Sequence, residues 1–275
     1  MDEKDDSLTA TLKKQVLSIV IITLNEERNI ERCLRSLQFS KNLFSKVEKL
    51  VVDAQSKDKT LAVARTLGAK TIVRPWKGYA DQKNWALSKC SGNWILSLDA
   101  DEELTPGLIA EIERQVPLTP GEVDGYFLKR KAFFLGKWIK HCGWWPDSQL
   151  RLIRKGAGAF TDRPVHEGLE VKGKTLELAE PLNHYAYESI EQYVEKMNRY
   201  SDLAIREAKP KKVRFWRYYL TVAAFITFFR MYITRKGFLD GWHGLAVCAL
   251  SAFHDFAKYA KLWEKEVLNI TGQVK

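Results

Sequence analysis

The sequence predicts an α/β fold built on a mostly parallel sheet that is flanked by helices. Short β-branched runs alternate with stretches of helical periodicity through the first half of the chain. Several of these runs are apolar throughout, which is typical of strands covered on both faces by helices. With 275 residues and 45% hydrophobic content, the chain can form one large domain, or one domain with an appendage.

The predicted elements pair each strand with a following helix. Strands that alternate with helices of this length imply βαβ units, and right-handed crossovers then make the sheet parallel. In chain order, the expected elements are a strand at 17–23, a helix carrying Ile30, Cys33, Leu34 and Leu37, a strand at 49–53, a helix capped by Asp58 and followed by Gly68, a strand at 69–73, a helix at 79–88, a strand ending at Asp99, and a helix beginning near Pro106.

The composition restricts the compartment and the partners. Four cysteines without metal-type spacing are typical of a reduced, intracellular protein. The N-terminal stretch has no apolar segment of the kind found in secretory signals, so we expect a cytoplasmic protein. A net charge of +10 indicates a negatively charged partner, such as an anionic membrane or a phosphorylated substrate. Zinc-finger spacing and RNA-binding aromatic motifs are absent from the sequence, so no nucleic-acid partner is predicted.

An acidic motif follows the strand that ends at Asp99. Residues 94–103 read WILSLDADEE, so Asp99 and Asp101 stand one residue apart at the carboxyl end of an apolar run. In open α/β sheets, ligands bind at this end of the strands. Two carboxylates here can hold a hard divalent cation that also contacts substrate phosphates. The alternative is a solvated acidic loop whose glutamates favour the N-terminus of the helix at Pro106.

Two earlier strands also end in polar residues. Asn25 and Glu26 follow the first strand, and Asp53 ends the second. The ends of these strands can converge with Asp99 on one crevice, where Asp53 could accept hydrogen bonds from a nucleoside. Its alternative is a helix-capping or turn acid. The sequence contains neither a dinucleotide-binding glycine motif after the first strand nor a P-loop, so those two classes of site lose support.

Three co-ordered stretches resemble the nucleotide-sugar half of family 2 glycosyltransferases, which have the Rossmann-like GT-A fold. They read LSIVIITLNEERNIERCLRSL, VVDAQSKDKT and KNWALSKCSGNWILSLDADEEL, and the resemblance covers roughly residues 1–115. Later stretches resemble, more narrowly, bacterial lipopolysaccharide core glycosyltransferases of the β-1,4-glucosyltransferase type. They read WWPDSQLRLIRKG, RPVHEGL, GFLDGWHGL and KYAKLWE.

The resemblance implies a role for each matching position. Asp99 would contact the ribose or a metal-bound water, Asp101 would ligate Mg²⁺ or Mn²⁺, and Lys83 would approach the nucleotide diphosphate. The other implied nucleotide-sugar contacts are Thr23, Leu24, Asn25, Glu26 and Asp53, the last of which would read the uracil or the ribose. The family pattern after the second strand is closer to D-D-G-S-x-D, whereas residues 53–58 read DAQSKD, without the second acid and the glycine.

An inverting transfer needs a base within hydrogen-bonding reach of the acceptor hydroxyl. Two acids in the second half are candidates for this catalytic role, Glu167 in PVHEGL and Asp147 in WWPDSQ. The resemblance favours Glu167, whose alternative is a surface acid paired with Arg163. Asp147 stands beside Pro146 and could equally be a turn residue.

Other side chains of the second half are candidates for contacts with the acceptor or a phosphate. Arg151 and Arg154 point to opposite faces if their stretch is a strand, so one of them can clamp a phosphate or remain a solvated edge charge. Trp144 and Trp145 could stack on an acceptor sugar or pack in a core. His166 and His184 are each either a metal ligand or a hydrogen-bonded structural group.

The C-terminal region has a different character. Ser189 and Gln192 resemble a capping box and predict a long helix that ends near residue 208. Two apolar runs follow, at 218–229 and 245–253, and neither reaches the ~20 residues of a spanning helix. Basic residues flank the first run, a pattern typical of helices that lie in the interface of an anionic bilayer. The alternative is an ordinary helical subdomain.

We therefore expect three parts in the chain. They are a flexible N-terminus at 1–15, a catalytic domain at 16–186 that divides into a nucleotide-sugar half (16–115) and an acceptor half (116–186), and a helical, membrane-associating appendage at 187–275. The predicted function is an inverting glycosyltransferase, peripheral on the inner face of the cell membrane. By resemblance it would move glucose from a UDP-sugar to a lipid-linked or lipopolysaccharide core acceptor. The open alternatives are a protein side chain or polyprenyl phosphate as acceptor, and a non-catalytic protein that binds anionic membrane or nucleic acid.

Overall fold

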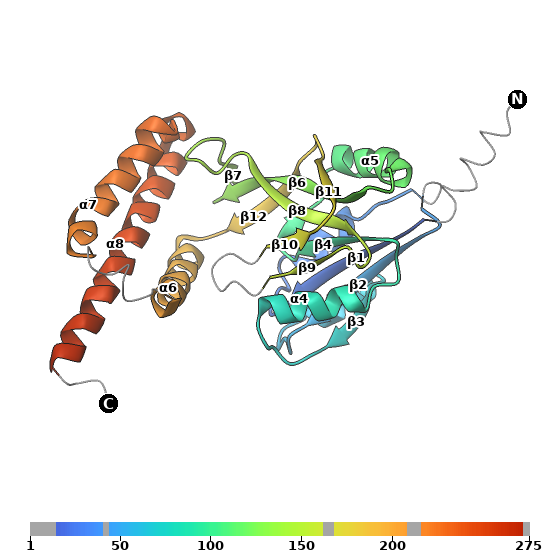
Figure 1. Ribbon diagram of the computed structural model, residues 1–275, viewed down its shortest axis with the longest axis horizontal. Helices are drawn as coiled ribbons and strands as arrows, with labels where there is room; N and C mark the ends of the chain where they lie inside the picture. The colour runs from blue at the N-terminus through green and yellow to red at the C-terminus, as the bar shows by residue number, and fades with distance from the viewer. Residues whose placement is uncertain (1–14, 41–43, 162–167, 208–215, 272–275) are drawn as a thin grey trace, which may run out of the picture. The chain divides into compact units, whose positions relative to one another are not determined.

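The computed structural model describes residues 15–40, 44–161, 168–207 and 216–271 (Figure 1). Within these residues the chain forms two compact units. The first unit contains residues up to 130, 147–161 and 168–184, and the second contains 131–146 and the described residues from 185 onward.

The first half of the sheet is parallel, as the sequence predicts. Its strands are β1 (Val16–Thr23), β2 (Lys46–Asp53), β3 (Lys70–Val73) and β4 (Trp94–Asp99), and they lie in the order β3-β2-β1-β4. In this register Thr23 lies opposite Asp53, and Ile22 lies opposite Asp99. The carboxyl ends of β1, β2 and β4 therefore meet at one edge of the sheet.

Beyond β4 the strands pair mostly antiparallel, with β11 parallel to β6, so the ten-stranded sheet of the described residues is a mixed one. The additional strands are β5 (Glu102–Glu103), β6 (Val123–Phe134), β7 (Lys137–Trp138), β8 (Asp147–Arg154), β11 (Lys174–Glu177) and β12 (Leu182–Tyr187). A separate pair is formed by β9 (Gly158–Phe160) and β10 (Leu169–Val171). Antiparallel neighbours need no crossover helix, so this half has none of the strand–helix alternation that predicts a parallel sheet.

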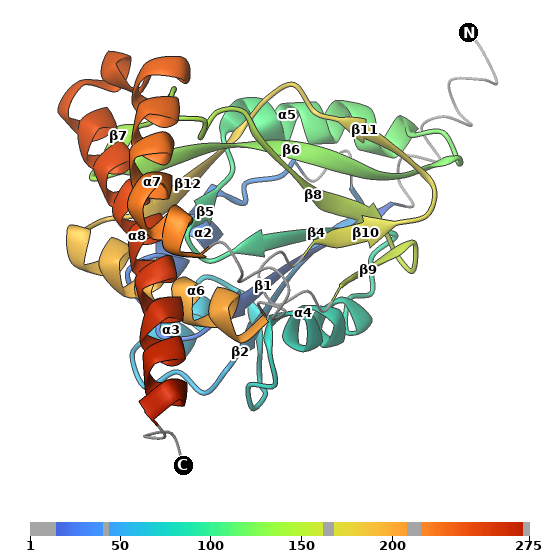
Figure 2. The same ribbon diagram turned by 60° about the vertical axis from the view of Figure 1, so that its left-hand side comes forward.

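Helices cover both faces of the parallel strands (Figure 2). Successive residues of a strand point to opposite faces. Leu17, Ile19 and Ile21 accordingly join one core with residues of α2 (Ile30–Ser36), α3 (Thr60–Thr66) and α5 (Pro106–Gln115). Val20 joins the other core, together with residues of α4 (Tyr79–Ser88) and the β9–β10 pair. Burial on both faces explains why these strands read as continuous apolar runs.

The ends of the predicted helices are confirmed with one exception. Helix α4 spans the predicted range, α5 begins at Pro106, and Gly68 follows α3 with a φ of +78°. Asp58 is not the N-cap of α3, because the cap position is Lys59. Asp58 lies two residues before α3, and its carboxylate accepts a hydrogen bond from the backbone N–H of Thr60, the first residue of this helix.

The second unit is mainly helical. Its long helices are α6 (Ile190–Glu207), α7 (Trp216–Phe229) and α8 (Gly241–Thr271), and a π-helical turn (Arg230–Thr234) and a 3₁₀ turn (Gly237–Asp240) join α7 to α8. The predicted cap is confirmed, because Ser189 Oγ accepts a hydrogen bond from the Gln192 N–H at 3.1 Å. Helix α8 extends far past the apolar run at 245–253. Among the described residues, the structure contains no helix with the length and apolar character needed to cross a bilayer.

The core of the second unit joins its helices to the loop around residues 139–144. Its buried members are Phe134, Ile139, Cys142, Tyr193, Met197, Met231, Val247 and Cys248. Asp240 is buried beside this core and accepts a hydrogen bond from the His141 N–H at 2.8 Å, while Lys137 Nζ donates to its carbonyl oxygen at 2.7 Å. These contacts fix the start of α8 against the β7 region.

Candidate functional site

The loops after β1 and β2 form a hydrogen-bonded shelf at the carboxyl edge of the sheet. The Asn25 N–H donates to Ser56 Oγ at 2.8 Å, and Asn25 Oδ1 accepts from the Lys57 N–H at 2.9 Å. Asn25 has a φ of +56°, a left-handed conformation that asparagine tolerates better than most residues. The Glu26 N–H donates to Thr60 Oγ1 at 2.8 Å. Leu24 and Asn25 are exposed on this shelf, as a nucleotide contact requires.

Asp53 stabilises this shelf through hydrogen bonds. Its side chain is fully buried and accepts hydrogen bonds from Thr23 Oγ1 at 2.9 Å and from the Ser56 N–H at 2.8 Å. Ser56 Oγ donates to the same carboxylate. The geometry therefore favours the turn-acid alternative for Asp53. In this arrangement Asp53 shapes the loop, and a nucleotide would meet the residues around it.

Asp99 lies between two cations. Its carboxylate oxygens are 2.8 Å from Lys83 Nζ and 2.6 Å from Arg151 Nη2. Burial alone would raise the pKa of Asp99, but the charges of Arg151 and Lys83 hold this pKa well below its usual 3.8. Asp99 is therefore ionised at any physiological pH. Lys83, which the sequence places near the diphosphate, is buried and also lies 5.0 Å above the ring of Phe160.

The buried side chain of Glu102 holds the backbone of the acidic motif in place. Glu102 is 1% exposed, and its carboxylate accepts a hydrogen bond from the Asp99 N–H at 2.9 Å. The same carboxylate receives Arg151 Nη2 at 2.7 Å and Arg130 Nη1 at 3.4 Å. Arg151 is therefore not exposed for an acceptor phosphate, because its buried guanidinium bridges Asp99 and Glu102. Of the two predicted arginines, Arg151 is therefore the one that faces the site, and it does so buried between carboxylates rather than in contact with solvent.

Asp147 forms a further ion pair next to those of Asp99 and Glu102. It begins β8, where its Oδ2 accepts hydrogen bonds from Arg130 Nε and Nη2, and its Oδ1 accepts from Gln149 Nε2. The series Lys83, Asp99, Arg151, Glu102, Arg130 and Asp147 thus forms one connected ion-pair network. A proton accepted by Asp147 would weaken its pair with Arg130. As a candidate base, Asp147 is therefore less well placed than the sequence alone indicates.

Asp101 and His184 are brought together by the pairing of β5 with β12. His184 Nε2 lies 3.5 Å from Asp101 Oδ2, and Asp101 is mostly buried. Among the described residues, His184 Nδ1 is a buried polar atom without a hydrogen-bond partner. A buried group of this kind is one that a bound ligand would satisfy.

These residues fit a cation that is shared with a substrate. Among the described residues, no group of three or more His, Cys, Asp or Glu side chains is arranged to hold a metal ion. Mg²⁺ does not require such a group, because it is usually bound through one or two carboxylates and the phosphates of a substrate. Asp101 provides one carboxylate, and both oxygens of Asp99 already contact cationic side chains.

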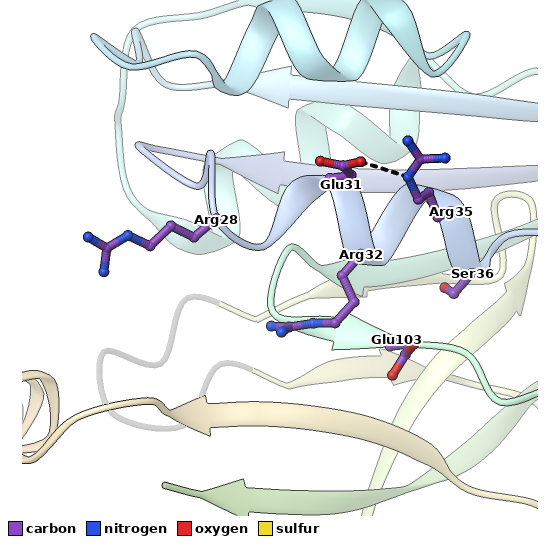
Figure 3. Close-up of a pocket in the computed structure, with 6 residues that line it drawn as sticks. All are labelled: Arg28, Glu31, Arg32, Arg35, Ser36 and Glu103. Atoms are coloured by element: carbon purple, nitrogen blue, oxygen red, sulfur yellow. Dashed lines mark hydrogen bonds and ion pairs between the residues drawn. The ribbon is translucent and has the colours of Figure 1, made fainter. Parts of the chain in front are cut away.

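A second surface feature lies along α2 in the same unit (Figure 3). It is a pocket of about 470 Å³ lined by Arg28, Glu31, Arg32, Arg35, Ser36 and Glu103. Arg35 Nε pairs with Glu31 Oε1 at 2.7 Å, and Arg32 Nη2 donates to Asn29 Oδ1 at 2.5 Å. The pocket was not predicted from the sequence; Arg32 and Arg35 lie on α2, and Arg28 lies just before this helix. Its charge is partly offset by the two glutamates.

Two of the predicted acceptor-side residues belong to the second unit, and the candidate metal ligand His166 lies outside the described residues. Trp144 and Trp145 belong to the second unit, where Trp144 packs near Phe134 with ring centroids 6.3 Å apart. Trp145 lies edge-on to Trp138, with centroids 5.4 Å apart. The core alternative is therefore what the structure shows for Trp144. Glu167 lies outside the described residues.

The chain matches one protein family clearly. The family model for glycosyl transferase family 2 matches residues 18–161. An uncharacterized glycosyltransferase of Rickettsia felis is 34% identical over 264 residues, which cover 90% of this chain and 89% of that protein. The chain belongs to glycosyl transferase family 2, and it is a glycosyltransferase. Together with the observed sheet, this membership confirms the predicted GT-A type of α/β fold.

Two further similarities concern individual proteins. The lipopolysaccharide core biosynthesis glycosyltransferase LpsC of Rhizobium meliloti is 28% identical over 277 residues, which cover 96% of this chain and 97% of LpsC. Glucosyl-3-phosphoglycerate synthase of Mycobacterium tuberculosis, solved in complex with Mn²⁺, UDP and glucosyl-3-phosphoglycerate, is 18% identical over 73% of this chain and 82% of its own. Its TM-score of 0.45 is too low to transfer residue roles.

Proposed function

We propose that the protein is an inverting glycosyltransferase that moves glucose from UDP-glucose to a lipopolysaccharide core or other lipid-linked acceptor. One observation carries the proposal: Asp99 and Asp101 lie at the carboxyl end of β4, where Asp99 is kept ionised and Asp101 lies beside His184. In a family 2 glycosyltransferase, this is the place where a nucleotide-sugar diphosphate and a divalent cation would be held.

Asp101 and His184 would hold Mg²⁺ or Mn²⁺ in this proposal. When bound, the cation neutralises the charge that develops on the departing nucleoside diphosphate. Lys83 lies at the same edge and directs a further positive charge toward this region. Arg151 and Glu102 keep the Asp99 carboxylate in one orientation, which reduces the reorganisation needed during the reaction.

The nucleoside would rest on the shelf after β1 and β2. Leu24, Asn25 and Glu26 offer exposed or half-exposed groups there, while Thr23 and Asp53 stay buried beneath them. We assign Thr23 and Asp53 to positioning, because each is at most 4% exposed. Uridine as the nucleoside rests on the family resemblance rather than on a contact in the structure.

Glu167 is the proposed base that removes the proton from the acceptor hydroxyl. It rests on the resemblance of the PVHEGL segment, and the engagement of Asp147 with Arg130 supports it indirectly. The acceptor proposal rests on the similarity to LpsC along almost the whole of both chains. A lipid-linked acceptor would place the enzyme at the inner face of the cell membrane.

A transfer assay tests the proposal. UDP-[¹⁴C]glucose and Mg²⁺ or Mn²⁺ are incubated with purified enzyme and either washed membranes of the source cell or its soluble protein fraction. Label in lipid-extractable or lipopolysaccharide material is the expected result, with the Asp101→Asn variant giving at least ~100-fold less. Label in the protein fraction alone would contradict the proposed acceptor. Transfer in a parallel reaction with labelled GDP-glucose, without transfer from UDP-glucose, would contradict the proposed donor.

A further inference from the structure

The connection between α7 and α8 exposes large apolar side chains. We call residues 229–242 the α7–α8 tip; it contains the last residue of α7, the two short turns and the start of α8 (Figure 1). The exposed fractions are 58% for Phe229, 54% for Ile233, 46% for Phe238, 56% for Leu239 and 83% for Trp242. Five such side chains are exposed within 14 residues of the chain, a higher local density than the scattered single exposures common in soluble domains.

The charges exposed at the tip are all positive. Arg230, Arg235 and Lys236 are exposed. The single acid between residues 229 and 242 is Asp240, which is 3% exposed and hydrogen-bonded to the His141 N–H. The tip therefore presents aromatic and aliphatic groups together with uncompensated basic groups.

The opposite side of the tip is packed tightly, so the apolar side chains cannot turn inward. Met231 is buried in the core of the second unit. A Cβ added to Gly237 would lie 2.8 Å from Cys248 Sγ and 2.9 Å from Cys142 Sγ. Lys236 has a φ of +55°, which sets the sharp turn between the π-helical and 3₁₀ segments. This packing fixes the exposed set in the folded unit.

We propose that the α7–α8 tip inserts into the headgroup region of a bilayer that contains anionic lipids. Tryptophan is favoured at the level of the headgroups because its ring is apolar and its N–H can hydrogen-bond. Basic side chains beside it gain from the negative surface potential of such a bilayer. The apolar and basic groups of the tip supply both attractions from one short segment.

Charge also distinguishes the bilayer from other occupants. A second copy of the chain docked through the same surface would bring two sets of Arg230, Arg235 and Lys236 together, and like charges oppose that contact. A nucleic acid would satisfy the basic groups but would leave Trp242 and Leu239 in water. Of these three occupants, only the bilayer satisfies both kinds of side chain.

This inference goes beyond the proposed function and does not depend on it. Insertion of the tip requires neither a nucleotide sugar nor an acceptor. Membrane binding can therefore be measured while the donor and the acceptor are absent, and either proposal can fail alone.

The test is flotation of the full-length protein with vesicles of phosphatidylcholine alone or of phosphatidylcholine and phosphatidylglycerol in a 3:1 ratio. We expect binding to the anionic vesicles that decreases as salt is raised. The double variant Leu239→Ser with Trp242→Ser should partition at least ~10-fold less, because its buried apolar area is lost. The pair Arg230→Gln with Lys236→Gln should lose most of the preference for anionic vesicles.

The matched control is Trp76→Ser, which removes a tryptophan that is 42% exposed in the first unit. Its binding should equal that of the unmodified protein. Circular dichroism melting curves identify any variant that fails to fold, and the single variant Leu239→Ser then replaces it. Equal binding by the tip variants and the control would overturn the proposal, as would no binding to anionic vesicles. Concentration-dependent dimers that vanish with Trp242→Ser would assign the surface to a second copy instead.

Discussion

Asp99 is held by two cations and by the hydrogen bond that its backbone donates to Glu102. This arrangement explains how a partly buried carboxylate remains ionised. The sequence predicts the importance of Asp99 and Asp101, because both follow an apolar strand. It does not predict Glu102 or Arg130, because Glu102 reads as one more acid of the loop and its partners lie 28 and 49 residues away. Periodicity reports local structure and contains no information on such distant pairs.

The lowered pKa of Asp99 predicts a specific dependence of stability on pH. Its folded-state pKa lies below 3.8, so its ion pairs stabilise the fold fully above the unfolded-state pKa. That contribution is lost as the pH falls through the folded-state value. The difference in unfolding free energy between the unmodified protein and Asp99→Asn should be constant from about pH 7 to pH 5 and shrink below about pH 4. Urea titrations measure it, with Glu31→Gln as the exposed control; a difference that grows on acidification would contradict the assignment.

Substitution of Glu102 tests the buried end of the network. Glu102→Gln should lower the unfolding free energy by ~2–3 kcal/mol, because the charged guanidinium of Arg151 then loses its buried carboxylate partner. It should also raise the KM for the metal–nucleotide complex, since the Asp99 N–H is no longer held by a carboxylate. The neighbour Glu103→Gln is the matched control and should cost less than ~1 kcal/mol. Urea unfolding and initial-rate kinetics give both quantities, and equal effects of the two variants would remove Glu102 from its positioning role.

At the scale of elements, α4 carries the site lysine and is tied to β9. Asn84 Nδ2 donates to the Phe160 carbonyl at 2.8 Å, and Asn84 Oδ1 accepts from the Phe160 N–H at 2.7 Å. Lys83, one residue earlier, lies over the same phenyl ring. The sequence predicts the parallel strands because each contains a continuous apolar run, and it predicts α4 in the segment between two of these runs. It does not predict the rest of the sheet, where β6 alternates irregularly and pairs with the two-residue strand β7, with β8 in antiparallel orientation and with β11 in parallel orientation.

The tie between α4 and β9 gives a prediction for Asn84→Ala. The Phe160 N–H and carbonyl would lose both partners, so the unfolding free energy should fall by ~2–3 kcal/mol. The affinity for UDP should fall as well, because Lys83 loses its fixed position beside Asp99. Ser88→Ala is the control on the same helix; Ser88 Oγ donates only to the Trp85 carbonyl, and its loss should change stability by less than ~0.5 kcal/mol. If Asn84→Ala changes stability no more than this control, the tie does not fix α4.

At the scale of the whole molecule, the two proposed activities lie in different units. The donor-site residues described above, from Asn25 to His184, lie in the first unit. The α7–α8 tip lies in the second. The division into a catalytic domain at 16–186 and an appendage at 187–275 stays a prediction, and the second compact unit also contains residues 131–146, which include the end of β6.

This division predicts that the two activities can be lost separately. The double variant Leu239→Ser with Trp242→Ser should bind UDP with an affinity within ~2-fold of the unmodified protein, because the donor-site residues and the tip belong to different compact units. Asp101→Asn should in turn float with anionic vesicles like the unmodified protein. Calorimetry and flotation on the same preparations measure both. Loss of vesicle binding in Asp101→Asn would contradict the separation.

We propose that the carboxyl edge of β1, β2 and β4 binds a uridine diphosphate together with a divalent cation. The most direct measurement is calorimetric titration of the purified protein with UDP and with GDP, each with and without Mn²⁺, repeated on Asp101→Asn. We predict binding that is selective for UDP, strengthened by Mn²⁺, and weakened at least ~10-fold by the substitution. Binding of UDP that is unaffected by both Mn²⁺ and Asp101→Asn, or equal binding of GDP, would contradict the account.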